Sequence, residues 1–281
     1  MGTSDMLGLM LALSSALVWG SADFLGGLAA RRMRSLAVLT LATLSGTLVL
    51  IALAVVCGEG VPAPAALAWS MAAGLSGAVG MAALYQGLAV STAAVVASTA
   101  AVTGVLLPTL FGMLSAGIPD PERVVGFVAG IGGVGLVSLQ TGDPDGELRR
   151  GLGLALAAGA GFGGFFILIS QVDGPAVFAP LAVAKGLALL VAVGMLLLWG
   201  REGSGSGGIG LALATGVLDA GGNVLYFAST RFTRLDVAVV LASLYSAITV
   251  VLTRLVLKER VNPVQGIGVI LCALAVAMMT L

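Results

Sequence analysis

The sequence predicts an all-α membrane protein whose ten transmembrane helices form two inverted five-helix repeats. Composition, ten long apolar runs and a likeness between the two halves of the chain carry this prediction. Of the 281 residues, 59% are hydrophobic and only 9% are charged. Soluble domains carry about 25% charged residues, so these charges are too few to cover a water-facing surface. We therefore expect a multi-pass protein surrounded by lipid, in a cell membrane such as the inner (plasma) membrane of a bacterium.

Ten apolar runs provide the expected spans. A helix needs about 20 mainly apolar residues to cross the hydrocarbon core, and continuous runs without period-two alternation favour helices over a β-barrel. The first run is longer than the apolar part of a signal peptide, so we expect a retained helix. We place the spans at residues 6–29, 35–57, 65–90, 92–116, 124–140, 150–171, 176–199, 208–230, 235–257 and 262–281.

Polar and loop-forming residues mark where these spans end. Three arginines, the last of them Arg34, follow the first span. Between the third and the fourth span, Ser91 and Thr92 are the only polar residues that mark a boundary. Pro108 lies inside the fourth span, where the backbone carbonyl that it frees permits a kink. The fifth span is short, and the glycine-rich residues 203–208 form a surface loop between the seventh and the eighth.

The longest polar connector falls in the middle of the chain and divides it into two units. We expect one five-helix repeat in residues 1–140, a central loop at 141–149 and a second five-helix repeat in residues 150–281. Since five is an odd number, the second half enters the membrane in the opposite orientation, a device of secondary transporters. Similar pairs of segments in the two halves are Gly8–Leu13 with Gly151–Leu156, Trp19-Gly20 with Phe162-Gly163, Leu84-Tyr85 with Leu225-Tyr226, and Val95-Val96 with Val239-Val240.

Loop charge predicts the orientation of the chain in the membrane. Cytoplasmic loops carry an excess of lysine and arginine. One predicted side holds only Arg123, Arg231 and Arg234. The other holds Arg31, Arg32, Arg34, Arg149, Arg150, Arg201, Arg254, Lys258 and Arg260. This bias places the larger group in the cytoplasm and both termini outside.

Residue content restricts the chemistry. The net charge is zero, which gives no basic surface for nucleic acid. The chain contains no histidine, and its two cysteines, Cys57 and Cys272, have no metal-ligand spacing. Gly159-Ala-Gly-Phe-Gly163 is no dinucleotide fingerprint because no strand precedes it, and there is no phosphate-binding loop. We expect neither a cofactor nor a metal site.

Two charged residues lie deep inside spans of the second half. Lys185 is near the middle of the seventh span, where a charge costs roughly 2.5–3.5 kcal/mol on insertion scales. Asp219 is near the middle of the eighth, and Asn223 and Tyr226 follow on the same helix face. We predict that these four residues bind substrate. The alternative for Lys185 and Asp219 is a structural ion pair, and Asp219 is also a candidate site for a coupling proton or a substrate amine.

The first half supplies four further candidates for substrate binding. Asp23 lies in the first span, four residues after Trp19. Tyr85 and Gln86 are polar residues within the apolar third span, and Tyr85 is repeat-related to Tyr226. The alternatives are that Asp23 pairs with the arginines at 31–34 and that Trp19 serves only in packing.

Three short motifs resemble the EamA branch of the drug/metabolite transporter superfamily. Ala16–Ser21 is similar to the family's aliphatic-Trp-Gly/Ser opening helix. Leu257-Lys-Glu-Arg-Val261, followed by Gln265-Gly266, is similar to its Leu-Gly-Glu-Arg turn and last helix, and Pro108 matches a proline that members often carry. The sequence departs from the family pattern at Glu122, displaced by about one residue from the expected glutamate, and at Ser246, where a proline would stand in the second half.

This resemblance implies a ten-span secondary transporter that binds no cofactor and is not an enzyme. Members move amino acids, metabolites or drugs, so we expect a small organic substrate, with export the favoured direction and a proton as a candidate coupling partner. Members often have cytoplasmic termini, which disagrees with the loop charges. The alternatives are an uptake carrier for sugars or nucleotide sugars and an intramembrane enzyme. The sequence gives no prediction of the oligomeric state.

Overall fold

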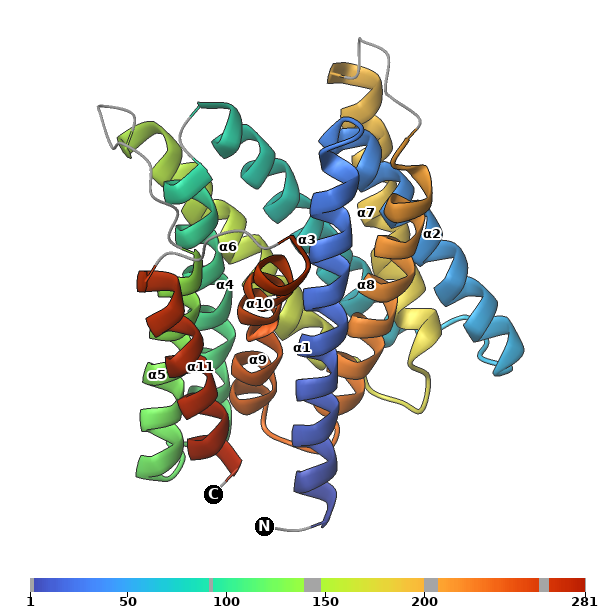
Figure 1. Ribbon diagram of the computed structural model, residues 1–281. Coiled ribbons are helices and arrows are strands. Elements are labelled where there is room, and N and C mark those ends of the chain that lie inside the picture. Colours follow the sequence, from blue (N-terminus) through green and yellow to red (C-terminus); the bar gives the residue numbers. More distant parts are fainter. Residues whose placement is uncertain (1–2, 91–92, 139–147, 200–206, 258–262, 281) are drawn as a thin grey trace.

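The structure is a computed structural model that describes residues 3–90, 93–138, 148–199, 207–257 and 263–280. All regular secondary structure in these ranges is helical (Figure 1). The helices of the first half are α1 (Thr3–Ala30), α2 (Ser35–Val56), α3 (Pro64–Val90), α4 (Ala93–Ala116) and α5 (Pro121–Ser138). Those of the second half are α6 (Leu148–Ser170), α7 (Phe178–Trp199), α8 (Ile209–Ser229), α9 (Leu235–Ser243), α10 (Tyr245–Leu257) and α11 (Pro263–Thr280).

The predicted spans coincide with these helices, and their ends differ by no more than three residues, with one exception. The ninth predicted span, residues 235–257, is divided at Leu244 into α9 and α10. At the division the Leu244 N–H donates to the Leu241 carbonyl, a tighter pattern than the α-helical one. The hydroxyl of Ser243 donates back to the Val240 carbonyl at 2.7 Å, and such back-bonding bends helices. The predicted extent of this span is confirmed, and the bend at Leu244 divides it into two helices.

Eight segments of the described chain are long and apolar enough to cross a membrane. They are α1 to α4, α6 to α8 and the run Leu235–Leu257 that contains α9 and α10. By the same measure α5 falls short, and α11 contains a shorter apolar stretch, Gly266–Ala275. Large apolar side chains such as Val56, Leu114 and Leu197 are exposed, as expected for a surface that faces lipid. The chain is a multi-pass membrane protein.

The two ends of the described chain lie on the same side of the bundle, at the bottom of Figure 1. We call this side the terminal face. The segments 57–63, 117–120, 171–177 and 230–234 connect helices there, and the opposite side, with the segment 31–34, is called the basic face.

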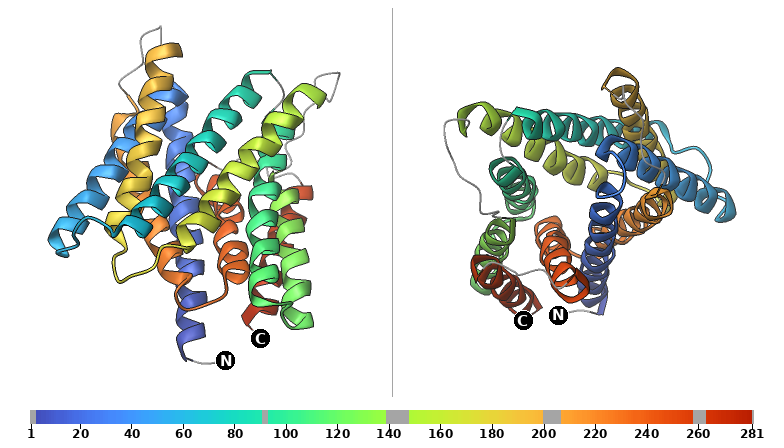
Figure 2. Two further views of the ribbon diagram at one scale, coloured as in Figure 1. Left: turned by 180° about the vertical axis from the view of Figure 1, so that it is seen from behind. Right: turned by 45° about the horizontal axis from the view of Figure 1, so that its top comes forward.

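Helices from the two halves pack mainly against one another. Extensive contacts join α3 with α6, α1 with α8, α5 with α11, α4 with α6, and α2 with both α7 and α8. The helices α5 and α11 pack together at one edge of the bundle (Figure 2). Small residues allow these close approaches: a Cβ atom at Gly74 would lie 2.6 Å from the Ala184 carbonyl oxygen.

Candidate functional site

A cavity of about 260 Å³ lies at the centre of the bundle, between the two halves. Ligand pockets of proteins measure roughly 300–1,000 Å³, so this cavity suits a metabolite better than a large drug. Most of its wall is apolar and comes from glycine, alanine, leucine, valine and phenylalanine. The side chains that bring a polar atom to the wall are Trp19, Asp23, Lys185, Asp219, Asn223, Ser243 and Tyr245.

Lys185 on α7 and Asp219 on α8 form an ion pair in the cavity wall. Their side chains are 16% and 33% exposed, so the pair is half-buried and open to the cavity. Gly46 on α2 leaves room for the lysine stem, since a Cβ atom there would lie 3.1 Å from Lys185 Cε. The sequence left two alternatives for Lys185 and Asp219, a position facing a cavity and a structural ion pair. In the structure the two residues are paired with each other and also line the cavity.

The backbone carbonyl of Asp219 is held from two sides. The side-chain amide of Asn223 donates to it at 2.6 Å, and the indole N–H of Trp19 donates to it at 3.2 Å. One turn further on, the hydroxyl of Ser15 donates to the Gly222 carbonyl at 2.8 Å. These bonds fix α1 against α8 at the level of the cavity.

Asp23 also lines the cavity, one helical turn from Trp19, and its side chain is exposed. Within the described ranges its carboxylate has no hydrogen-bond or ion-pair partner. The predicted alternative, an ion pair between Asp23 and the arginines at 31–34, is therefore absent from the part of the chain that the structure describes.

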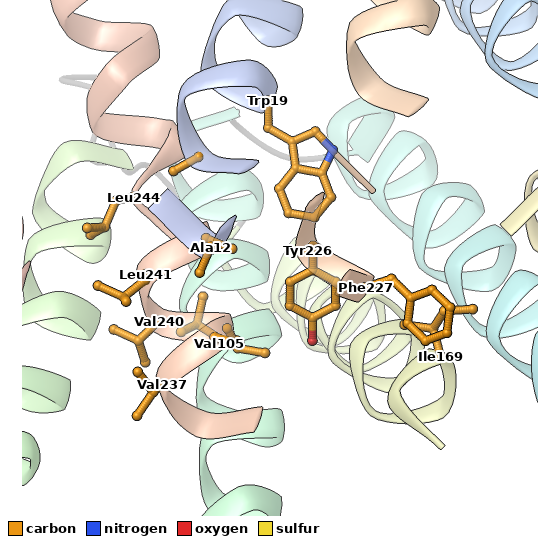
Figure 3. Packing of buried hydrophobic residues seen from close by; sticks show 14 of the residues in the cluster. Ala12, Trp19, Val105, Ile169, Tyr226, Phe227, Val237, Val240, Leu241 and Leu244 are labelled. Carbon is orange, nitrogen blue, oxygen red and sulfur yellow. The ribbon is translucent and has the colours of Figure 1, made fainter. Parts of the chain in front are cut away.

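Aromatic rings form one wall of the cavity. The centroid of Trp19 lies 5.9 Å from that of Phe166 and 6.1 Å from that of Tyr245. Tyr226 is fully buried and packs behind this wall, below Trp19 in Figure 3. The centroid of its ring lies 4.8 Å from that of Phe166 and 5.8 Å from that of Trp19. Its hydroxyl points away from the indole and donates to the Phe166 carbonyl at 3.4 Å. Tyr226 thus supports the wall without lining the cavity.

The remaining predicted contacts lie elsewhere. Gln86 is exposed and does not line the cavity, and the side chain of Tyr85 lies outside the described residues. The glutamate of the motif at 257–261, Glu259, lies outside them as well. Sequence reasoning did not select Phe162, Phe165 and Phe166, whose only signal is their clustering in α6 beside glycines.

A second set of polar residues joins helix ends at the terminal face. Arg123 at the start of α5 pairs with Asp5 of α1 at 3.3 Å. The other oxygen of Asp5 accepts a hydrogen bond from the Thr233 hydroxyl at 2.8 Å. These contacts bring α1, α5 and the segment 230–234 together.

Arg234 links the same segment to the end of α4. Its guanidinium pairs with Asp236 at 2.7 Å and donates to the carbonyls of Ala116 at 3.0 Å and Gly117 at 2.5 Å. The Asp236 side chain is fully buried, so Arg234 neutralises a charge that water does not reach. Hydrogen bonding to Asp236 raises the pKa of Arg234 above the ordinary arginine value.

Glu59 and Arg231 complete the connections. The carboxylate of Glu59 accepts hydrogen bonds from the N–H groups of Val177 at 2.8 Å and Ala179 at 2.7 Å, at the start of α7. Arg231 donates to the carbonyls of Pro175 at 3.2 Å and Ala176 at 2.6 Å. Burial lowers the pKa of Arg231, and the charge of Glu59 opposes that shift. We call the whole set the polar belt; its members are Asp5, Glu59, Arg123, Arg231, Thr233, Arg234 and Asp236.

Comparison with known proteins supports the family resemblance and the fold. Residues 149–281, just under half of the chain, match the EamA-like transporter family, which agrees with the resemblance that the sequence motifs indicated. No curated protein matches the chain. A solved structure described as the crystal structure of a protein covers 98% of this chain and 98% of its own, with a TM-score of 0.81 and 17% identity. At that identity the likeness shows the fold alone.

Proposed function

We propose that the chain is a secondary transporter of small organic metabolites that works by alternating access. The central cavity carries the proposal, because it lies at the level where the two halves meet and both halves contribute charged or polar groups to it. Transporters of this kind bind substrate near the midplane between two structural repeats. The match of residues 149–281 to a transporter family agrees with this function.

The proposal includes ten membrane crossings and an inverted repeat. Exchanging the halves pairs α1 with α6, α2 with α7 and α3 with α8. The contact of α1 with α8 then becomes that of α6 with α3, and the contact of α2 with α8 becomes that of α7 with α3. All four of these helix contacts are among the main contacts of the bundle. This agreement supports two related units at 1–140 and 150–281 around a shared site.

Alternating access also requires a barrier that opens and closes on each side. The polar belt supplies the charge pairs for such a barrier at the terminal face, because it joins the segments 57–63, 117–120, 171–177 and 230–234. We therefore propose that this conformation is closed at the terminal face. Interfaces held by a few exchangeable ion pairs are common in proteins that switch between two packed arrangements.

Within the cavity, we assign substrate contact to Trp19, Asp23, Lys185, Asp219 and Asn223. Tyr226 holds the aromatic wall in place, contact by Tyr85 stays a prediction from sequence, and Gln86 lies outside the cavity lining. A charged lining favours a charge-bearing substrate over a neutral sugar. An intramembrane aspartyl enzyme would need two facing carboxylates, and Asp219 is already paired with Lys185.

Counterflow in proteoliposomes tests the proposal. Vesicles containing the purified chain are loaded with unlabelled amino acids, amines or sugars, and entry of the same labelled compound is followed. We expect counterflow for at least one class, its loss in Asp219→Asn, and normal counterflow in Asp173→Asn, which neutralises an exposed carboxylate of the segment 171–177. Absence of counterflow for all three classes argues against a carrier, and unchanged counterflow in Asp219→Asn removes that residue from the site.

A further inference from the structure

Among the described residues, the cavity wall holds two carboxyl side chains and one ammonium side chain. Its charged side chains are Asp23, Lys185 and Asp219. Lys185 and Asp219 neutralise each other as an ion pair. Asp23 is left as a carboxylate without a partner among the described residues, on the face of α1 that lines the cavity. A carboxylate without an ion-pair partner in a membrane protein is a candidate contact for a cationic ligand, and Lys185 is the one basic side chain that the described part of the wall provides.

Aromatic rings surround the same space. Trp19 precedes Asp23 by one helical turn, so the two side chains lie on one face of α1. Tyr245, Phe162, Phe165 and Phe166 line the cavity with them. The faces of such rings attract a cation placed within about 6 Å of the ring centre. A carboxylate and several rings around one cavity are the features that recognise organic ammonium groups.

We propose that the cavity binds an organic monocation that carries a flat apolar group, with Asp23 as its counter-charge. This inference rests on the proposed function and names the substrate class of the same site. A zwitterion such as an amino acid fits less well, because its carboxylate would need Lys185 to leave Asp219. An anion would meet the negative charge of Asp23 and fits worst.

Benzyltrimethylammonium is a suitable probe, because it combines a phenyl ring with a positive charge that does not depend on pH. Three matched compounds separate its features. Phenylacetate keeps the ring and reverses the charge, tetramethylammonium keeps the charge without the ring, and phenylalanine is a zwitterion with the same ring. Each is titrated by calorimetry into the purified full chain in detergent.

We expect benzyltrimethylammonium to bind at least about tenfold more tightly than each of the other three compounds, a difference of about 1.4 kcal/mol or more. This comparison uses the unaltered chain and so does not depend on the folding of a variant. Tighter binding of phenylacetate or phenylalanine overturns the proposal, and so does the absence of benzyltrimethylammonium binding.

Variants then identify the counter-charge. In Asp23→Asn, affinity for benzyltrimethylammonium is expected to fall by about tenfold or more, whereas Asp23→Glu retains part of it. Asp173→Asn removes one negative charge from an exposed position and is expected to leave affinity unchanged. Equal binding by Asp23→Asn and the unaltered chain excludes Asp23 from the site.

The binding experiments test the cation site, and the counterflow experiments test the carrier, so either proposal can fail while the other holds. Counterflow of amino acids or sugars without binding of benzyltrimethylammonium leaves the carrier in place and overturns the cation site. Binding of benzyltrimethylammonium that Asp23→Asn weakens, without counterflow of any compound class, retains the cation site and overturns the carrier.

Discussion

The ammonium group of Lys185 and the carboxylate of Asp219 join α7 to α8 across the wall of the central cavity. These helices otherwise pack mainly against other partners, α7 against α2 and α3 and α8 against α1 and α2. The Lys185 side chain passes α2 at Gly46, where the lack of a side chain on α2 leaves room for it. One ion pair therefore links two helices of the second half over a helix of the first.

Removal of one partner from this pair is expected to destabilise the protein. Asp219→Asn leaves Lys185 without a counter-charge, and an unpaired charge at the bilayer centre costs roughly 2.5–3.5 kcal/mol on insertion scales. The double variant Lys185→Met with Asp219→Leu removes both charges, so it is expected to unfold at a higher temperature than Asp219→Asn. Transport should be lost in both. Thermal unfolding in detergent measures the first effect and counterflow the second. If the double variant is no more stable than the single one, the pair is not a coupled unit.

Arg234 is expected to hold the terminal face closed. Arg234→Gln removes the charge partner of the fully buried Asp236 and weakens the bonds to Ala116 and Gly117. Thr109 on α4 lies one turn beyond the cavity toward that face and is only 2% exposed. With Cys57 and Cys272 replaced by serine, a cysteine at position 109 should react several-fold faster with a membrane-impermeant thiosulfonate in Arg234→Gln.

Arg32→Gln provides the control, because Arg32 is an exposed residue of the segment 31–34 on the basic face. It should leave the labelling rate at position 109 unchanged. Equal rates in the Arg234→Gln and Arg32→Gln backgrounds contradict a closing role for the polar belt.

Helix positions could be predicted from the sequence because each span needs its own run of apolar residues. The division at Leu244 could not, since it depends on serine hydroxyls returning to their own backbone in a segment as apolar as its neighbours. The polar belt also escaped prediction. Asp5 and Arg123 are far apart in the chain, and only the packing of α1 near α5 brings them together.

Within the cavity, charge was easier to predict than shape. Asp23, Lys185 and Asp219 were identified because a charged residue in an apolar run is conspicuous. The phenylalanines of α6 were not, because apolar residues inside a span carry no such signal. If the proposed repeat continues in the register that sets Trp19 above Phe162, Phe166 stands where Asp23 stands in the first half. Under the proposed repeat, the two halves would contribute unlike groups from equivalent places, a carboxylate from α1 and a ring from α6.

Glu59 is expected to stabilise the start of α7. Its carboxylate accepts two backbone hydrogen bonds there, and a negative charge at a helix N-terminus is favourable. Glu59→Ala should lower the free energy of unfolding by about 1–2 kcal/mol and speed hydrogen exchange at Val177 and Ala179. Glu59→Gln keeps one oxygen acceptor, so its free energy of unfolding and its exchange rates are expected to lie between those of Glu59→Ala and the unaltered chain. Exchange at these amides that does not change in Glu59→Ala would contradict the assignment.

The close contact between Gly222 and Trp19 gives the last prediction. A Cβ atom at position 222 would lie 2.6 Å from Trp19 Nε1 and 2.7 Å from its Cγ. The indole cannot move aside freely, because it is bonded to the Asp219 carbonyl and packed against Tyr226. Gly222→Ala should therefore destabilise the protein by about 1–3 kcal/mol through overpacking and weaken ligand binding, since Trp19 lines the cavity.

Gly186 on α7 supplies the matched control, because a Cβ atom there would meet no described atom within 4 Å. Gly186→Ala is expected to be neutral or to stabilise the helix by up to about 1 kcal/mol. Thermal unfolding of both variants, with calorimetric titration of benzyltrimethylammonium, measures the two effects. A Gly222→Ala variant that is as stable as Gly186→Ala and binds the probe equally well would show that Trp19 is free to move. Its ring could then not be a fixed part of the cavity wall.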